Sequence, residues 1–455
     1  MFVNPAEGVE GVQDDGGEPG DEPDDARLRS RRRFLAELGG ALGVTLAVDA
    51  GLDDVAASAD AVSRALTPLP SGYVFRRLIT KHHRELGDVR QLLPPVMLGG
   101  PYIVFLAKER SGRHAAYRAR IGGGRDPQIT AVHRMVGEGR RLRGGARVAK
   151  IAPGDLGGGS RWVTVLGAGR AGALVAVHEP GKGLRALVRR GDRAPGGGRF
   201  TGHFGDVDAD RKGDVLLLAH VNDDGVVREG LFRFPTGTRA HGRRLLQAGR
   251  PVPGTSAIIT SFGSLDRHGD TFVVQIFARR PGSRRQLSHE PSLILRGRLG
   301  RRNPDYRVLV AHPALRPRGR TFRGEALTAA RAHSGGMAVT VGHVGQAQHL
   351  HLHGRGGPRR VGGTRRGGAQ SLSPGVIGGD GLLFYQEISR RDTRILVRGG
   401  GRQREVLSRG DRIGAHRLEF PWFGWHPEQA DEHGRLVFLA DLTDGSRAIV
   451  LGTPV

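Results

Sequence analysis

The sequence contains no cysteine, which excludes disulfides, thiolate metal sites, iron–sulfur clusters and a cysteine nucleophile. Aromatic residues are scarce, at 5% of the 455 residues. Beyond the amino-terminal signal region described below, no apolar run approaches the roughly 18 residues that cross a bilayer, so we expect no membrane span in the mature protein. Gly-x-Ser-x-Gly, His-Glu-x-x-His and phosphate-loop motifs are missing, and no two carboxylates show the spacing of a catalytic pair. The sequence therefore indicates no substrate and no reaction.

One glycine string resembles a dinucleotide-binding loop. Gly167-Ala-Gly169-Arg-Ala-Gly172 follows an apolar stretch, as such a loop would. A helix must come next to face the pyrophosphate, but Pro180-Gly181 ends the following stretch after only a few residues. We interpret the string as a hairpin turn and predict no nucleotide cofactor.

Basic residues outnumber acidic ones, and nearly all of them are arginine. The formal charge is +25, from 70 Lys and Arg against 45 Asp and Glu, and five lysines leave 65 arginines. So lopsided a ratio is what a GC-rich genome would give without selection. The functional alternative is a polyanion or carbohydrate partner, attracted over long range and held by guanidinium forks.

The amino terminus predicts disorder followed by an export signal. Residues 1–29 are acidic and rich in glycine and proline, which is typical of a disordered leader. Within 30–59, Arg31-Arg32 precede Phe34-Leu35 and a Gly- and Ala-rich apolar run, and this resembles a bacterial twin-arginine signal. The resemblance implies a periplasmic or extracellular protein; the alternative is a surface helix with a basic first turn.

Seven times, a polar turn with a glycine leads directly into a β-rich apolar stretch. The glycines are Gly100, Gly172, Gly213, Gly269, Gly336, Gly381 and Gly434. They lie 41 to 72 residues apart, which brackets one four-stranded propeller blade with loop insertions. We predict an all-β fold over 71–455, a β-propeller of seven blades, with six or eight as alternatives. Residues 73–79 are expected to complete the last blade, because closure would hide the sheet edges.

A second repeat supports this prediction. Ala186-Leu-Val-Arg-Arg-Gly-Asp192 recurs as Glu405-Val-Leu-Ser-Arg-Gly-Asp411, with a looser copy at 244–249. Asp210-Arg-Lys-Gly213, Asp266-Arg-His-Gly269 and Asp431-Glu-His-Gly434 resemble the bacterial exported tandem-repeat family named for an Asn-x-x-Gly-x-x-Ala-Phe repeat, with aspartate in place of asparagine. That resemblance implies a β-propeller without a settled activity.

An aspartate-rich loop is the first candidate site. Asp206, Asp208, Asp210 and Asp214 stand at positions 1, 3, 5 and 9 of a loop, a spacing at which oxygen ligands can surround Ca²⁺. Together with Phe204-Gly205, the loop resembles the calcium loop of FG-GAP propeller repeats, although Arg211 stands where that loop has glycine. The alternative is a solvated turn.

Two further clusters could bind ligands. His349, His351 and His353 alternate with leucines, so on a strand the imidazoles share one face; they could bind Zn²⁺ or Cu²⁺ with help from a neighbouring element, or form a polar outer face. Trp422, Trp425 and His426 form the densest aromatic cluster, suited to stacking on a sugar ring or to core packing. The Gly/Arg-rich stretch 355–368 has no aromatic to stack on bases, so we interpret it as a cationic loop and expect no nucleic-acid partner.

These observations favour an exported, monomeric, non-catalytic binding protein. The competing hypothesis is a propeller enzyme, a hydrolase or lyase acting on acidic polysaccharide, with its pocket on the central axis.

Overall fold

The computed structural model of the chain describes residues 69–455, with gaps, and all of them belong to the second of two compact units, Gly51–Val455. The gaps are 88, 98–100, 124–126, 143–146, 152–161, 168–171, 180–182, 211–212, 236–241, 289–290, 301–303, 313, 316–321, 324–325, 333–337, 345–346, 355–356, 365–370, 374, 379–380, 390–391, 400–401, 425–428 and 432. The expected acidic leader (1–29) and export signal (30–59) lie outside the described residues. No helix of the described part is long and apolar enough to span a membrane.

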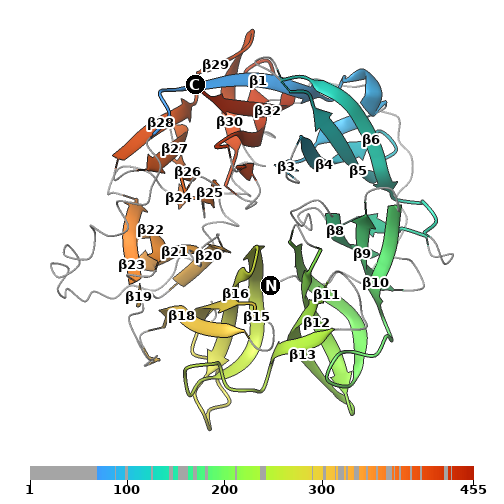
Figure 1. Ribbon diagram of the computed structural model, residues 1–455, viewed down its shortest axis with the longest axis vertical. Helices are drawn as coiled ribbons and strands as arrows, with labels where there is room; N and C mark the ends of the chain where they lie inside the picture. The colour runs from blue at the N-terminus through green and yellow to red at the C-terminus, as the bar shows by residue number, and fades with distance from the viewer. Residues whose placement is uncertain are drawn as a thin grey trace, which may run out of the picture. The chain divides into compact units, whose positions relative to one another are not determined.

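The unit is a seven-bladed β-propeller, as predicted: seven sheets follow one another around a ring, all antiparallel apart from one short parallel pairing in the fourth (Figure 1). The strands of blades 1 to 3 are β2 (Val89–Leu92), β3 (Val96–Met97), β4 (Tyr102–Glu109), β5 (His114–Ile121) and β6 (Ile129–Gly137); β7 (Lys150–Ile151), β8 (Trp162–Gly167), β9 (Ala173–Glu179) and β10 (Gly183–Arg189); β11 (Arg199–Ala209), β12 (Val215–Asp223), β13 (Val226–Phe234) and β14 (Arg243–Gln247). A 3-10 helix, η2 (Arg84–Leu86), precedes blade 1.

Blades 4 to 7 continue the same order. Their strands are β15 (Ile258–His268), β16 (Thr271–Arg279), β17 (Leu293–Arg298), β18 (Asp305–Ala311) and the short β19 (Phe322–Arg323); β20 (Ala326–Ala332), β21 (Ala338–Val344), β22 (Ala347–Gly354) and β23 (Gly357–Gly363); β24 (Ser371–Leu372), β25 (Val376–Ile377), β26 (Leu383–Ile388), β27 (Thr393–Gly399) and β28 (Arg402–Ser408); β29 (Arg412–Ile413), β30 (His416–Trp422), β31 (Leu436–Leu442), β32 (Arg447–Pro454) and β1 (Tyr73–Thr80). With the short strands β3, β19, β25 and β29 left out, each blade has four strands, and the fourth strands are β6, β10, β14, β18, β23, β28 and β1. The fourth strands that Figure 1 labels lie at the circumference of the ring.

The core lies between blades. The second strand of a blade is covered on both faces, and for this reason β12 begins with five consecutive buried residues, Val215-Leu-Leu-Leu-Ala219. Alternate residues of a strand serve opposite junctions: Leu231 of β13 packs in the cluster between blades 3 and 4, and Phe232 in the cluster between blades 2 and 3. Each blade is therefore held mainly by its two neighbours.

The ring closes as the sequence predicts, with the first strand of the domain completing the last blade. β1 pairs antiparallel with β32, from Tyr73 opposite Pro454 to Thr80 opposite Ala448. Ser71 N–H donates to Val455 O and Val455 N–H donates to Gly72 O, so the pairing continues to the end of the chain. β1 therefore covers the edge of β32 that would otherwise be exposed.

Both sequence repeats correspond to repeated turns. In the turns from first to second strand, Gly213 and Gly434 N–H donate to the carbonyls of Asp210 and Asp431, and Gly381 N–H donates to Gly378 O in the same way. These glycines have φ of 86°, 70° and 83°, a conformation that other residues adopt only with strain. Asp266 differs, because it lies within β15 and the turn at Gly269 is a two-residue hairpin.

The turns from the fourth strand to the next blade repeat more closely. Gly191 and Gly410 N–H donate to the carbonyls of Phe200 and Leu418 at the start of the next blade. The Asp192 and Asp411 carboxylates accept the backbone N–H of Arg189 and Ser408, each at 2.8 Å. The same backbone pattern occurs at 247–250, within the looser copy, and at 137–140, a further copy that the sequence comparison missed.

One of the seven glycines precedes a different strand of its blade from the others. Gly172 precedes β9, the third strand of blade 2, whereas four of the others precede a second strand and Gly100 and Gly336 lie outside the described residues. In the sequence, Gly159 stands before the true second strand, β8. Using Gly159 changes the uneven spacings of 72 and 41 residues to 59 and 54.

Candidate functional site

The four aspartates of the predicted calcium loop lie at the junction between blades 3 and 4. Asp206 and Asp208 are on β11, and Asp210 and Asp214 flank the turn into β12. Asp206 Oδ2 accepts Leu265 N–H at 2.9 Å, and Asp208 Oδ2 accepts Arg267 N–H at 2.8 Å. The two accepting aspartates are two residues apart on β11, and the two donating amides are two residues apart on β15. Because alternate residues of a strand point to the same side, both carboxylates face β15.

Bulges explain why β15 offers these amides. The pairing of β15 with β16 shifts between Ile259 and Ser261 and again between Phe262 and Leu265. Glu229 Oε2 accepts Phe262 N–H at 2.8 Å, and Gln275 Oε1 accepts Ser264 N–H at 3.2 Å. At these bulges, side chains from blade 3 and from β16 thus accept hydrogen bonds from amides of β15 that would otherwise bond to backbone carbonyls.

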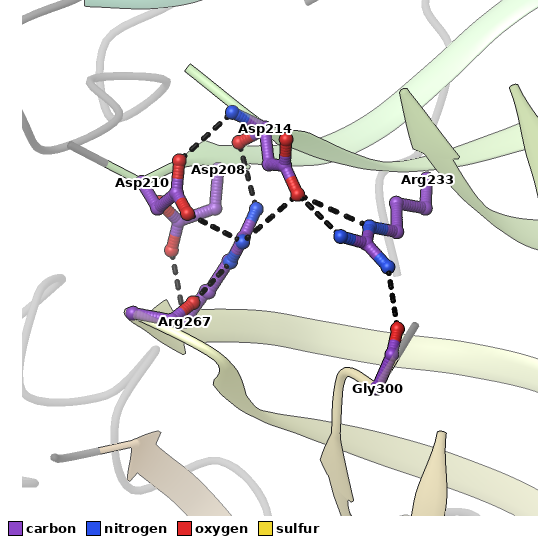
Figure 2. Close-up of polar contacts among 7 residues, drawn as sticks. Asp208, Asp210, Asp214, Arg233, Arg267 and Gly300 are labelled. Atoms are coloured by element: carbon purple, nitrogen blue, oxygen red, sulfur yellow. Dashed lines mark hydrogen bonds and ion pairs between the residues drawn. The ribbon is translucent and has the colours of Figure 1, made fainter. Parts of the chain in front are cut away.

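Arg267 is the centre of this junction (Figure 2). Its side chain is 0% exposed, and Nη2 donates to Asp210 Oδ2 at 2.8 Å. Nη1 donates to Asp214 O at 2.7 Å, and Nε donates to Gly269 O at 2.7 Å. One guanidinium therefore binds the turn of blade 3 to the turn of its own blade 4.

Arg233 extends the network at its partly exposed side. It donates from Nη2 to Asp214 Oδ2 at 2.6 Å and from Nη1 to Gly300 O at 3.2 Å, as Figure 2 shows. Asp214 Oδ2 also lies 3.8 Å from Arg267 Nη2. Two arginines thus approach one carboxylate oxygen, and Arg233 donates to it from both Nε (3.2 Å) and Nη2 (2.6 Å) in charge-assisted hydrogen bonds.

Burial sets the protonation of the acidic groups. Burial, and secondly the charge of Asp266, raise the pKa of Asp208 well above its usual range, although Arg267 acts in the opposite direction. Asp208 Oδ1 is buried without a hydrogen-bond partner in the described part of the chain. Burial also raises the pKa of Glu229. Two of the carboxylates that approach β15 therefore favour the proton-bound form more than a free side chain does.

The structure gives the predicted calcium ligands other partners. Asp206 and Asp208 accept backbone amides, and Asp210 and Asp214 bind arginines. Within the described residues, no group of three or more His, Asp or Glu side chains is arranged to hold a metal ion. Arg211, which departs from the calcium-loop pattern, lies outside the described residues. Calcium binding stays a prediction, and calorimetric titration with Ca²⁺ tests it.

Similar polar contacts occur at other blade junctions. Glu138 Oε1 accepts Ile151 N–H from blade 2, and Gln348 Oε1 accepts Leu372 N–H from blade 6. Gln386 of blade 6 accepts Phe423 N–H at 3.3 Å and donates to Pro421 O at 2.6 Å. In each case a side chain binds the backbone at or next to an inner strand of the following blade. Sequence reasoning missed these residues, because a single Glu or Gln carries no motif.

The three histidines lie on β22 and share one face, as predicted, but the face is not an outer one. His351 and His353 are 5% and 2% exposed. Neighbouring ring centroids are 5.9 Å and 6.4 Å apart, so the rings run along the strand and do not converge. His353 Nε2 lies 2.7 Å from Thr340 Oγ1. The interpretation as a polar outer face is wrong for these two residues, because blade 4 covers them.

Trp422 packs at the junction between blades 7 and 1. It contacts the apolar cluster that includes Phe105 and Leu439. Its indole Nε1 donates to Asp441 Oδ2 at 3.0 Å, and Arg447 lies over its ring at 5.9 Å. Trp425 and His426, its predicted companions in a ligand site, lie outside the described residues.

Comparisons with known proteins find similarity to solved structures alone, at low sequence identity. No family model matches the sequence, and neither does any curated protein. Among solved structures, the chain is similar to a puromycin-hydrolyzing peptidase of Mycobacterium tuberculosis, with 14% identity, a TM-score of 0.47, and 84% of this chain and 56% of the peptidase covered. It is also similar to YCF48 bound to D1 peptide (11%, TM-score 0.40, 86% and 98% covered) and to TolB from Acinetobacter baumannii (11%, TM-score 0.34, 74% and 63% covered). The chain thus spans little more than half the length of the peptidase.

Proposed function

We propose that the protein is an exported, non-catalytic binding module whose ligand is a polyanion. The observation that carries the proposal is the charge of the seven fourth strands at the circumference of the ring. These strands carry twelve arginines and two acidic residues, Asp305 and Glu405. The arginines are Arg76, Arg77, Arg134, Arg185, Arg189, Arg243, Arg244, Arg307, Arg359, Arg360, Arg402 and Arg404. We call them the arginine belt.

None of the belt arginines is buried, and at least one lies on every blade. Charge on the outermost strand of a sheet prevents edge-to-edge pairing, but either sign would serve that purpose. A single sign repeated around the ring instead creates a continuous positive potential. Such a potential suits a long anionic chain, which contacts several blades at once.

Some belt arginines have acidic partners, and these contacts leave the belt cationic. Arg134 binds Glu109 at 2.8 Å, and Arg244 lies 3.4 Å from Asp223. Arginine is suited to the proposed ligand, since its planar fork binds phosphate, sulfate or carboxylate oxygens in pairs.

Dextran sulfate and uncharged dextran test the proposal, because they share a backbone and differ in charge. We expect retention on dextran sulfate that weakens steeply with salt, and none on dextran. The triple variant Arg77→Gln, Arg189→Gln, Arg402→Gln, at three exposed positions on different blades, should bind at least about tenfold more weakly, equivalent to about 1.4 kcal/mol. Gln403→Ala on β28 is the matched control and should bind as the wild type does. Equal binding by the triple variant and the wild type would remove the belt from the proposal.

Export has a separate test. Residues 1–59 fused to a reporter that folds in the cytoplasm should carry it across the membrane of a bacterium with a twin-arginine pathway. Replacing Arg31 and Arg32 by lysine should keep the reporter inside. Transport that survives this replacement would contradict the twin-arginine interpretation.

A further inference from the structure

Two arginines lie directly opposite each other in blade 4. Arg296 on β17 and Arg307 on β18 are cross-strand partners. Like charges in this position normally destabilise a sheet. The charge of Arg307 is, after burial, the next cause that lowers the pKa of Arg296, and Asp305 acts in the opposite direction. The pair therefore carries an unfavourable interaction that a bound anion would relieve.

Both side chains face blade 5. Leu293 and Leu295 of β17 pack in the cluster between blades 3 and 4, whereas Ile294 packs with Ala338 of β21. Arg296 follows Ile294 by two residues and therefore shares its face. Arg307, directly opposite, lies on that face too.

Blade 5 presents basic groups to the same junction. Burial, together with the charges of His351, Arg307 and Arg296, lowers the pKa of His353 to about 3. His351 is the cross-strand partner of Arg360 on β23, so Arg360 shares the histidine face. Arginines of both blades therefore face this junction, which they share with two imidazoles whose pKa values are lowered to about 4 (His351) and about 3 (His353).

The side chains of β20, which borders this junction, lie outside those that the structure describes. Of the described side chains, five form its apolar cluster: Val273, Ile294, Leu309, Val310 and Ala338. Beside this cluster, arginine and histidine side chains lie on the facing sides of the two blades. We call Arg296, Arg307 and Arg360 the junction arginines.

We propose that the junction arginines bind one tetrahedral oxyanion, a phosphate or sulfate group, between blades 4 and 5. Guanidinium forks from three strands supply paired donors to the oxygens, and the anion's charge offsets the repulsion between Arg296 and Arg307. The inference goes beyond the proposed function, since one free anion suffices to fill the site whether or not the belt binds a polymer.

Thermal unfolding in sodium phosphate and in sodium chloride at equal ionic strength is the first test. Phosphate should raise the Tm of the wild type along a saturating curve, and sulfate should do the same. Arg307→Gln should weaken phosphate binding at least about tenfold by calorimetry. In chloride the same variant should melt about 1–3 °C higher than the wild type, because the opposed charge is gone. A variant that merely unfolds would show the reverse.

Arg307→Lys separates charge from geometry. It keeps the charge and loses the fork, so its phosphate affinity should fall between those of the wild type and Arg307→Gln. Arg412→Gln, at an exposed position on β29 of blade 7 outside the arginine belt, is the matched control and should keep the full phosphate response. Equal phosphate stabilisation of the wild type and Arg307→Gln, or no phosphate effect beyond that of chloride, would overturn the site.

The source of the anion is distinguished by dextran sulfate. Arg307→Gln binding the polymer as well as the wild type while losing phosphate supports a site for a free anion. Joint loss of both supports a site for a group carried by a polymer. Failure of the belt triple variant to affect polymer binding leaves the phosphate result unchanged, so the two proposals fail separately.

Discussion

Arg267 Nη2 and Asp210 Oδ2 lie 2.8 Å apart with both side chains almost wholly removed from solvent, at 0% and 4% exposure. The pair connects two blades, and three further hydrogen bonds from Arg267 lead to backbone carbonyls or to Asp208. Desolvation makes such a pair costly to form, so its presence is weak evidence of net stability, but breaking it leaves a buried charge without a partner.

Removing the guanidinium should therefore destabilise the propeller strongly. We expect Arg267→Met to lower the free energy of unfolding by about 3–5 kcal/mol, because the carboxylates of Asp210 and Asp214 lose their buried cation. Urea denaturation measures the change. Arg435→Met is the control: its 2.6 Å contact with Asp431 is partly exposed, and such pairs contribute about 0–1 kcal/mol. Equal losses of unfolding free energy in the two variants would show that the buried pair contributes no more to stability than the partly exposed pair.

Asp208 should make the protein less stable as pH rises. Its folded pKa is raised, so the stability it contributes is fully present below the pKa of the unfolded chain and is lost as pH rises toward the folded value. Asp208→Asn copies the protonated form and keeps an oxygen for Arg267 N–H. We expect this variant to exceed the wild type in stability at pH 8 and to match it near pH 4, measured by urea denaturation. A variant less stable than the wild type at pH 8 would contradict the assignment.

His353 should act with the opposite sign. Its folded pKa is lowered to about 3, so the stability it contributes is present above the unfolded value near 6.5 and is lost as pH falls below it. The wild type should lose up to about 1.4 kcal/mol per pH unit for each such histidine between pH 6 and pH 4. His353→Gln should reduce that slope by about one proton. Parallel curves for variant and wild type would show that His353 is charged in the folded state.

Closure of the ring should depend on the buried side of β1. Ile79 is 1% exposed and pairs with Ile449, whereas Val74 on the same strand is 41% exposed. We expect Ile79→Ala to cost about 2–5 kcal/mol of unfolding free energy and Val74→Ala about 0.5 kcal/mol or less. A small effect at Ile79 in denaturant titration would mean that blade 7 is stable without β1.

The sequence predicted the fold through features that are local. Glycines with positive φ, such as Gly213 and Gly434, mark turns because other residues are strained there, and apolar runs such as 215–219 mark strands covered on both faces. Such glycines do not number the strands: Gly172 precedes a third strand, and a glycine turn looks the same before a second strand and before a third.

The candidate sites could not be predicted in the same way. The spacing of Asp206 and Asp208 is equally suited to a metal loop and to pairing with the amides of β15, and only the position of β15 decides between them. Likewise, alternation placed the histidines on one face but gave no information on what covers it. Side chains that join blades lie far apart in sequence, as Glu229 and Phe262 do, so no local pattern records them.

The pairing of β1 with β32 also sets an order of events during synthesis. β1 is made before any other described strand of the domain and its partner after all of them, so blade 7 cannot be completed until β32 has left the ribosome. Contacts of such long sequence separation are slow to form. Until then the open edges of β1 and β31 need protection from pairing with other chains.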